Sequence, residues 1–244
     1  MIICEIGLNH MGDTEYANKY LKSIIRSKAD GVIFHIREKS FYQNKKTSKF
    51  ELPDEFYFQA SKKLKKNRIQ LGIALADPEK LDLCERFKAD FYKIFSRDVL
   101  KQDLVNLVHD TRKKVFVSTG MSDLSEIKKF MDGIKKNKKQ ITLIHTQLNN
   151  NLSFANLKAI PILKNKFHVN IAYGNHTKNI NILYTVLAFE PTDVLFYVKG
   201  NKAKKHIDET HAVPLDDLSE IIYNLRELPN SLGKKKIKMN NQIE

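Results

Sequence analysis

Two charged residues, Glu5 and Lys93, stand inside short runs of the sequence that are otherwise apolar. Such runs are typical of buried strands, and a buried charge is costly unless a charge of opposite sign pairs with it. We therefore expect Glu5 and Lys93 to meet inside the fold. Clusters of perturbed charges usually mark sites of acid–base or anion-binding chemistry, and the alternative is an inert internal ion pair.

Further polar residues lie at or just after the ends of apolar runs, and they are of the types that bind ligands or move protons. They are His35, Arg37, Ser96, Asp98, Ser118, Thr119, His145, Asn175, His176 and Lys199. If the apolar runs are parallel strands of a barrel, these side chains gather at the one rim where the strands end. That rim is the candidate functional site.

Eight apolar runs alternate with amphipathic segments. The predicted strands are residues 2–6, 31–36, 69–74, 91–95, 115–119, 141–146, 169–173 and 194–198, and the predicted helices are residues 14–26, 54–66, 78–87, 98–111, 123–134, 154–164, 180–190 and 215–228. Nearly all-apolar strands are typical of parallel sheets covered on both faces. Strict alternation predicts an α/β protein, a single (β/α)8 TIM barrel. The rival is an open doubly wound sheet, but the chain has no Gly-x-Gly-x-x-Gly turn.

The barrel is expected to occupy residues 1–228. The stretch 38–53 is polar and rich in Lys and Asn, which predicts an extended loop after the second strand. Residues 229–244 are basic and show no periodicity, so we expect a disordered tail there.

The chain of 244 residues carries a formal charge of +14, and 35 of its 42 cationic residues are Lys. Nucleic-acid readers favour Arg, so we rank a coding bias first, an anionic substrate second and nucleic-acid binding third. No secretory signal and no apolar stretch of membrane-spanning length is recognisable, and the two cysteines form no disulfide framework. We therefore expect a cytoplasmic protein without nucleic-acid or membrane partners.

Several short motifs, in chain order, resemble those of the sialic acid synthase family, which includes N-acetylneuraminate, legionaminate and pseudaminate synthases and a spore-coat polysaccharide enzyme. Residues 5–13 read Glu-Ile-Gly-x-Asn-His-x-Gly-Asp, residues 92–96 read Tyr-Lys-Ile-x-Ser, and residues 118–122 read Ser-Thr-Gly-Met-Ser. His145 stands at the family's His-Cys position, and residues 175–177 (Asn-His-Thr) resemble its Ser-Asp-His-Thr. The similarity covers essentially the whole chain.

The resemblance implies an enzyme that condenses phosphoenolpyruvate with an N-acetylated hexose, or its 6-phosphate, for surface glycan biosynthesis. The enol carbon attacks the open-chain aldehyde, water adds at the phosphate-bearing carbon, and phosphate leaves. Such a reaction needs Lys, Ser and N–H donors around phosphate and carboxylate, and a divalent metal, manganese or magnesium, that polarises the aldehyde oxygen. The small-molecule partners are then phosphoenolpyruvate and an amino sugar, and a homodimer is compatible with the resemblance.

Transferred residue by residue, the resemblance assigns roles to most of the rim residues, and Arg37 and His35 are added as replacements where the family pattern is altered. The candidates are Glu5, Lys93 and Asp98 for catalysis, Ser96, Ser118, Thr119, Asn175, Asp208 and Arg37 for substrate binding, and His176 and His35 for the metal. Asp98 stands where the family has Glu. His35 is a replacement ligand, because the family's second metal histidine aligns with Tyr197.

Some family positions are altered. A phosphoenolpyruvate-binding lysine aligns with Ile33, a threonine with Ala74, and an Asn-x-Tyr-Pro motif with residues 148–151. Arg37 and Lys199 can return a cation to the rim, because side chains at even spacing along a strand point the same way. A length of 244 residues is about what one barrel needs, so the family's C-terminal antifreeze-like domain is not expected. Two functions stay open: a divergent barrel-only synthase, and a catalytically degenerate homologue that acts as a binding or assembly subunit.

Overall fold

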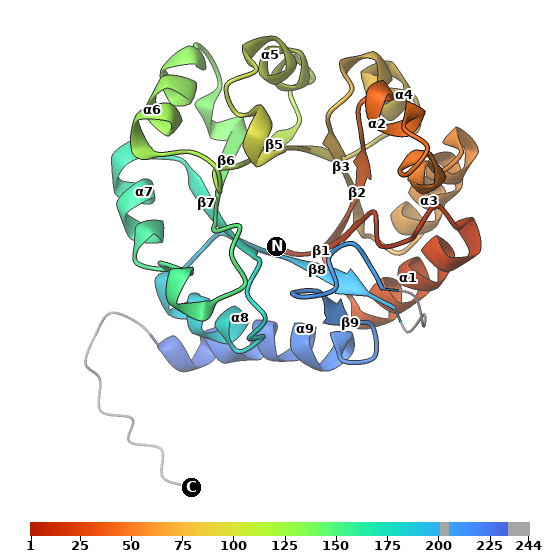
Figure 1. Ribbon diagram of the computed structural model, residues 1–244. Coiled ribbons are helices and arrows are strands. Elements are labelled where there is room, and N and C mark those ends of the chain that lie inside the picture. Colours follow the sequence, from red (N-terminus) through yellow and green to blue (C-terminus); the bar gives the residue numbers. More distant parts are fainter. Residues whose placement is uncertain (201–204, 234–244) are drawn as a thin grey trace, which may run out of the picture.

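The computed structural model describes residues 1–200 and 205–233, which form a closed barrel of parallel strands inside a ring of helices (Figure 1). The barrel strands are β1 (Ile2–Gly7), β2 (Gly31–Ile36), β3 (Gln70–Leu75), β4 (Phe91–Ile94), β5 (Lys114–Ser118), β6 (Ile141–Thr146), β7 (Asn170–Asn175) and β8 (Asp193–Lys199). They pair in chain order, and β1 also pairs with β8, which closes the sheet. The predicted (β/α)8 barrel is confirmed. A two-residue strand, β9 (Val213–Pro214), pairs with the end of β8.

The helices surround the barrel, and each falls within or close to a predicted helical segment. They are α1 (Thr14–Ser27), α3 (Asp54–Lys66), α4 (Leu81–Arg86), α5 (Gln102–Asp110), α6 (Leu124–Gly133), α7 (Ala159–Phe167), α8 (Ile182–Thr185) and α9 (Leu218–Glu227). Aspartate side chains cap the first turns of two of them. Asp13 accepts a hydrogen bond from Tyr16 N at the start of α1, and Asp123 forms a capping box with Glu126 at α6.

Two segments that were expected to be irregular contain short helical elements. The stretch 38–53, expected to be an extended loop, contains a helix, α2 (Lys39–Gln43), and a 3₁₀ turn, η1 (Ser48–Phe50). Phe50 and Leu52 are buried, so a few apolar side chains fold this polar stretch against the barrel. In the predicted tail, η7 (Leu228–Leu232) is a 3₁₀ turn, and residues 234–244 lie outside the described residues.

A layer of apolar side chains from all eight strands fills the barrel interior. They are Ile3, Ile33, Ala74, Phe91, Phe116, Ile144, Ala172 and Leu195. A Cβ at Gly72 would come within 2.1 Å of the Phe91 ring, so this glycine makes room for the ring.

The next level of the barrel interior, toward the rim, is mostly polar. Side chains two residues further along a strand point the same way. The residues at this level are Glu5, His35, Ala76, Lys93, Ser118, Thr146, Gly174 and Tyr197. The apolar layer therefore closes the barrel beneath a set of charged and hydroxyl groups.

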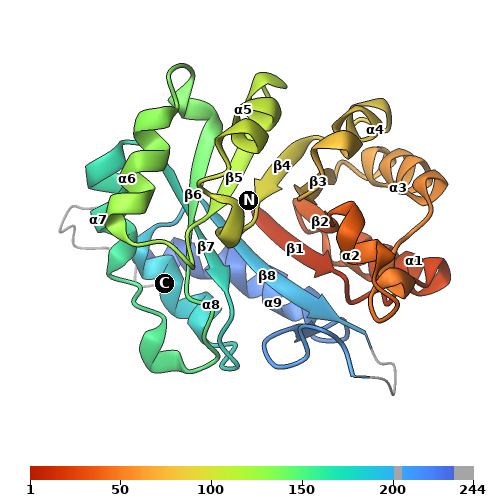
Figure 2. The same cartoon turned by 45° about the horizontal axis from the view of Figure 1, so that its top comes forward.

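Because all eight strands are parallel, their carboxyl ends share one rim. Figure 2 shows β1, β7 and β8 running toward the lower edge, where the segments after β6, β7 and β8 lie together. Hydrogen bonds join these segments: Lys178 N donates to the carbonyl of Asn150, and the Thr210 hydroxyl donates to Asn150 Oδ1. Loops distant in sequence thus build one side of the site.

Candidate active site

Glu5 and Lys93 form an ion pair at the polar level of the barrel, as the sequence predicts. Lys93 Nζ lies 2.6 Å from each carboxylate oxygen of Glu5, and the side chains of Lys93 and Glu5 are 8% and 2% exposed. Burial alone would favour the neutral carboxyl, but Lys93 and His35 outweigh it and hold the pKa of Glu5 well below its ordinary range. Glu5 is therefore ionised at neutral pH and has a fixed partner.

A cavity of about 190 Å³ adjoins this pair. Its lining residues are Arg37, Lys93, Phe95, Ser96, Arg97, Ser118, Met121, Leu148, His176 and Tyr197. The hydroxyl oxygens of Ser96 and Ser118 are 2.7 Å apart. An ammonium, two hydroxyls and two guanidinium groups on one cavity form a donor set suited to phosphate or carboxylate.

His35 is hydrogen-bonded to Glu5, with 2.7 Å between His35 Nε2 and Glu5 Oε1. Burial lowers the pKa of His35, and the neighbouring carboxylate opposes that shift only in part. A neutral His35 donates Nε2–H to Glu5, so this nitrogen is not open to a metal ion. The hydrogen bond to Glu5 therefore leaves only Nδ1 of His35 for the metal ion that the sequence suggested.

Asp98 and Thr119, two predicted site residues, are turned toward other partners. Asp98 is buried and pairs with Lys101 at 2.7 Å and Arg97 at 3.5 Å. The Thr119 hydroxyl donates to the carbonyl oxygen of Ile144 at 3.0 Å. Neither Asp98 nor Thr119 is among the residues that line the cavity.

Arg37 is the replacement cation that reaches the cavity. It donates two hydrogen bonds to Glu38, at 3.1 and 3.2 Å, and its guanidinium lies 4.1 Å from the centroid of the Phe41 ring. Lys199, the other predicted replacement, donates to Glu209 at 2.5 Å and is not among the cavity residues. Of the two expected compensations, the structure places only Arg37 at the site.

Asn175 lies at the end of β7, and its side chain holds the turn that follows. Its Oδ1 accepts hydrogen bonds from Thr177 N at 3.1 Å and from the Thr177 hydroxyl at 3.0 Å. The same residue lines a small void beside Glu5, Lys93 and His176. Asn175 therefore positions its neighbour His176 as well as adjoining the ion pair.

A cluster of rings lies where β7 and β8 end. The ring centroids of His176 and His211 are 4.5 Å apart, and Tyr197 packs edge-on against them at 5.5 and 5.1 Å. Burial lowers the pKa of His176 to about 3 and that of His211 to about 4, so both imidazoles are neutral at pH 7. Sequence reasoning identified His176 but not His211, because the segment that carries His211 departs from the family pattern.

Asp208, only loosely aligned by the sequence, lies next to this cluster. A Cβ at Gly7 would meet Tyr197 Cε1 at 3.0 Å, His35 Cε1 at 3.2 Å and Asp208 Oδ2 at 3.4 Å. Gly7 has a φ of +56°, so a glycine is favoured on both conformational and spatial grounds. Burial raises the pKa of Asp208 to about 7, and the negative charge of Glu5 acts in the same direction.

Two histidine side chains, His176 and His211, are the groups at this site that suit a divalent cation. No group of three His, Cys, Asp or Glu side chains in residues 1–200 and 205–233 is placed to hold a metal ion. His176 and His211 are adjacent neutral imidazoles, and His211 Nε2 is buried without a hydrogen-bond partner among those residues. Two imidazoles suit a divalent cation if water and substrate oxygens supply the other ligands.

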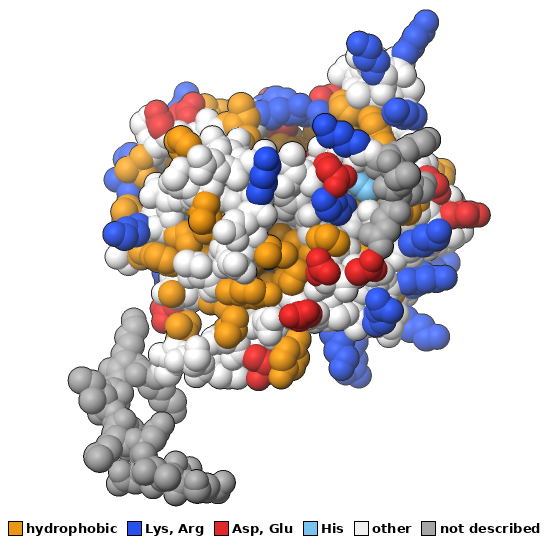
Figure 3. Space-filling view, turned by 60° about the horizontal axis from the view of Figure 1, so that its bottom comes forward, with side chains coloured by type: hydrophobic (Ala, Val, Ile, Leu, Met, Phe, Trp, Pro, Cys, Tyr) orange, Lys and Arg blue, Asp and Glu red, His pale blue; other side chains and the backbone are white. Residues whose placement is uncertain are grey.

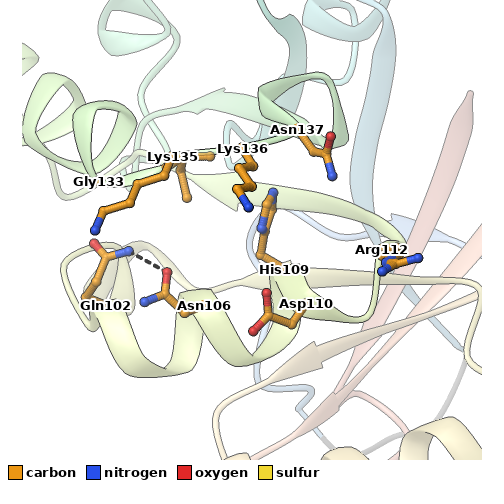
Figure 4. Close-up of a pocket in the computed structure, with 10 residues that line it drawn as sticks. Gln102, Asn106, His109, Asp110, Arg112, Gly133, Lys135, Lys136 and Asn137 are labelled. Atoms are coloured by element: carbon orange, nitrogen blue, oxygen red, sulfur yellow. Dashed lines mark hydrogen bonds between the residues drawn. The ribbon is translucent and has the colours of Figure 1, made fainter.

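A larger cavity of about 820 Å³ lies between α5 and the segment after α6 (Figure 4). Gln102, His109, Lys135 and Lys136 are among its lining residues, and Gln102 donates to Asn106 at 2.8 Å. This cavity shares no lining residue with the rim cavity. The convergence of charges at the barrel centre, rather than cavity size, therefore identifies the candidate active site.

Figure 3 displays one face of the molecule, in which the side of the barrel that carries α8 and α9 comes forward. On this face Lys and Arg side chains lie mainly toward the edges, with acidic side chains among them, and hydrophobic side chains gather across the middle. No helix in the described part of the chain is long and apolar enough to cross a membrane.

The barrel and its charged rim place the chain among (β/α)8 proteins whose site lies at the carboxyl ends of the strands. Within that class the chain belongs to the NeuB family, whose model matches residues 15–237. The resemblance to sialic acid synthases is confirmed.

Relatives of the chain include synthases of legionaminic, pseudaminic and N-acetylneuraminic acid. N,N'-diacetyllegionaminic acid synthase of Campylobacter jejuni is 26% identical over 258 residues, covering 96% of this chain and 77% of that protein. Pseudaminic acid synthase of the same species is 22% identical, covering 99% and 77%. The solved N-acetylneuraminic acid synthetase of Leptospira borgpetersenii has the same fold, with a TM-score of 0.90 and 24% identity over 98% of this chain and 87% of that one. These relatives support a synthase role of the NeuB type.

Proposed function

We propose that the chain is a divergent synthase that condenses phosphoenolpyruvate with an N-acetylated hexose, or its 6-phosphate, in surface glycan biosynthesis. The observation that carries this proposal is the convergence of Lys93, Ser96 and Ser118 on one cavity at the barrel rim. One ammonium and two hydroxyls are groups that bind the phosphate and carboxylate of phosphoenolpyruvate. Membership of the NeuB family agrees with this assignment.

The residues of the chain can bind the substrate and handle protons. Lys93 and the two serines donate to the anionic oxygens, and Arg37 compensates for the apolar Ile33 with a second cation. The enol electrons form a bond from the terminal carbon to the aldehyde carbon, whose oxygen gains a proton. Water adds at the phosphate-bearing carbon and loses a proton. The bond from that carbon to the phosphate oxygen then breaks, the carbon becomes a ketone, and the remaining hydroxyl proton leaves with the phosphate.

Glu5 is a weak base for this water, because Lys93 and His35 hold its pKa well below its ordinary range. Its ionised carboxylate instead orients Lys93 and His35 at the site. A divalent cation, manganese or magnesium, would polarise the aldehyde oxygen when bound, and His176 is one residue that would hold it.

The test is phosphate release from phosphoenolpyruvate with Mn²⁺ and a panel of N-acetylated hexoses and their 6-phosphates, together with the mass of the sugar acid formed. We expect release with at least one sugar and its loss in Lys93→Met. Lys128→Met, at an exposed pair with Asp132, is the control and should keep full activity. A folded wild-type chain that releases no phosphate with any sugar would contradict the proposal.

A second function, a binding or assembly subunit without turnover, is favoured by one observation. Both oxygens of Glu5 are bonded to Lys93, so the ammonium is already neutralised in the absence of substrate. Ile33 and Tyr197 also stand where the family has a lysine and a histidine. On this hypothesis the chain binds a complete synthase in a pull-down and releases no phosphate.

A further inference from the structure

The segment 205–212, which precedes β9, is hydrogen-bonded to the barrel although it forms no helix or strand. Lys199, at the end of β8, donates to the side chain of Glu209 at 2.5 Å. The N–H of Asp208 donates to Asn9 Oδ1 at 3.1 Å. The pairing of β9 with β8 holds the far end of the segment. These contacts hold the segment against the ends of β1 and β8.

His211 lies in this fixed segment, and its ring lies beside that of His176. The ring centroids are 4.5 Å apart with an interplanar angle of 37°. His211 Nε2 is buried, and across residues 1–200 and 205–233 it makes no hydrogen bond. Asp208 Oδ1 lies 3.8 Å from it, beyond hydrogen-bond distance. A buried nitrogen without a partner is costly, so His211 Nε2 is expected to bind a group from outside the chain.

Two explanations account for the adjacent rings. In one, His176, Tyr197 and His211 are an aromatic packing cluster, and any ring of similar size would serve. In the other, the two imidazoles present their lone pairs to a cation. The second explanation is favoured by two observations together: His211 Nε2 has no partner in the described residues, and the ring of a second histidine, His176, lies 4.5 Å away.

We propose that His176 and His211 are the two protein ligands of a divalent cation, whose other positions are filled by water and by oxygen atoms of the substrate. A histidine from the loop after β8 then replaces the strand histidine that the family has at the position of Tyr197. The proposal rests on the proposed function only for the source of the substrate oxygens. Since two protein ligands make a weak site, phosphoenolpyruvate should tighten the binding of the cation.

The experiment is a titration of the full chain with Mn²⁺, followed by the electron paramagnetic resonance signal of the free ion, with and without phosphoenolpyruvate. His211→Phe keeps a ring of similar size against His176 and Tyr197 but removes the ligand nitrogen. We expect at least a tenfold loss of Mn²⁺ affinity in His211→Phe and in His176→Phe, with an unchanged circular dichroism spectrum.

His109→Phe is the matched control. His109 also has a buried Nε2 without a partner in the described residues, but it lies in the cavity beside α5. This variant should bind Mn²⁺ as the wild type does. Equal affinity in His211→Phe and wild type, or a wild-type chain that binds no Mn²⁺ even with phosphoenolpyruvate, would overturn the proposal.

Phosphate release, measured separately, distinguishes this inference from the proposed function. Loss of Mn²⁺ affinity in His211→Phe without turnover by the wild type supports the metal site and contradicts the synthase. If the wild type turns over and His211→Phe keeps its Mn²⁺ affinity, the synthase is supported and the metal site at His211 is contradicted.

Discussion

Lys93 Nζ lies 2.6 Å from both oxygens of the Glu5 carboxylate, and this contact joins two strands, β1 and β4, that are not neighbours in the barrel. The pair therefore crosses the barrel interior directly above the apolar layer. It also has a functional consequence. An anionic substrate that binds Lys93 must compete with the Glu5 carboxylate for the ammonium group. Binding of such a substrate is therefore coupled to the breaking of the Glu5–Lys93 contact.

The ion pair leads to a prediction about stability. Glu5→Gln leaves the Lys93 ammonium buried without its counter-charge, so we expect the free energy of unfolding to fall by about 3–5 kcal/mol. Urea unfolding followed by circular dichroism measures this. The double variant Glu5→Gln/Lys93→Met should be more stable than Glu5→Gln alone, because it removes the unpaired charge. Equal stability of these two variants would show that the pair contributes little.

Glu38 leads to a prediction about pH. Burial opposes its ionisation, but hydrogen bonds from Arg37 and the charge of Arg97 outweigh burial and lower the pKa of Glu38 to about 2, from an ordinary value of 4.5. The folded chain thus binds this proton less readily than the unfolded chain. The stabilisation is fully present above about pH 4.5 and is lost as pH falls toward 2.

The Glu38 side chain is 33% exposed, so solvent screening limits this contribution to about 1 kcal/mol or less. The measurement compares the free energy of unfolding of wild type and Glu38→Gln at several pH values. The difference should be present at pH 6 and shrink between pH 4.5 and 2. A difference that stays constant over this range would argue against the Arg37–Glu38 pair as its source.

The fold could be predicted because its signals are local. Apolar runs at strand spacing and capping residues such as Asp123 act over a few neighbours in sequence. The pair of Glu5 and Lys93 was also predictable, because a buried charge needs a partner wherever the strands bring one.

Other parts of the site depend on side-chain direction and on loop placement, which no local pattern fixes. Asp98, the last residue of a 3₁₀ turn, pairs with Lys101, and the Thr119 hydroxyl donates to a backbone carbonyl. His211 reaches His176 only because hydrogen bonds such as that from Asp208 N to Asn9 hold its loop. A single sequence gives no signal for contacts between residues about 200 positions apart.

Gly7 leads to a prediction about the geometry of the site. Its φ of +56° is unfavourable for alanine by about 1–2 kcal/mol, and a Cβ would press on Tyr197 at 3.0 Å. Gly7→Ala should therefore lower both the melting temperature and the affinity for Mn²⁺. Gly233→Ala is the matched control, because Gly233 also has a positive φ but has no atom within 4 Å of the added Cβ. If both variants bind Mn²⁺ equally, space at Gly7 does not matter to the site.

Ser118 and Thr119 lead to a prediction that separates substrate binding from structure within two adjacent residues. The Ser118 hydroxyl faces the cavity beside Ser96, whereas the Thr119 hydroxyl is bonded to a carbonyl oxygen. A hydrogen bond to a charged group contributes about 1.5–3 kcal/mol, so Ser118→Ala should weaken phosphoenolpyruvate binding by about tenfold or more in calorimetric titrations. Thr119→Val should leave that affinity unchanged and lower the free energy of unfolding by about 1 kcal/mol. If Thr119→Val weakened phosphoenolpyruvate binding and Ser118→Ala did not, the anion site would not lie at Ser118. The hydroxyl that binds the substrate would then be that of Thr119, which in the structure donates to a backbone carbonyl.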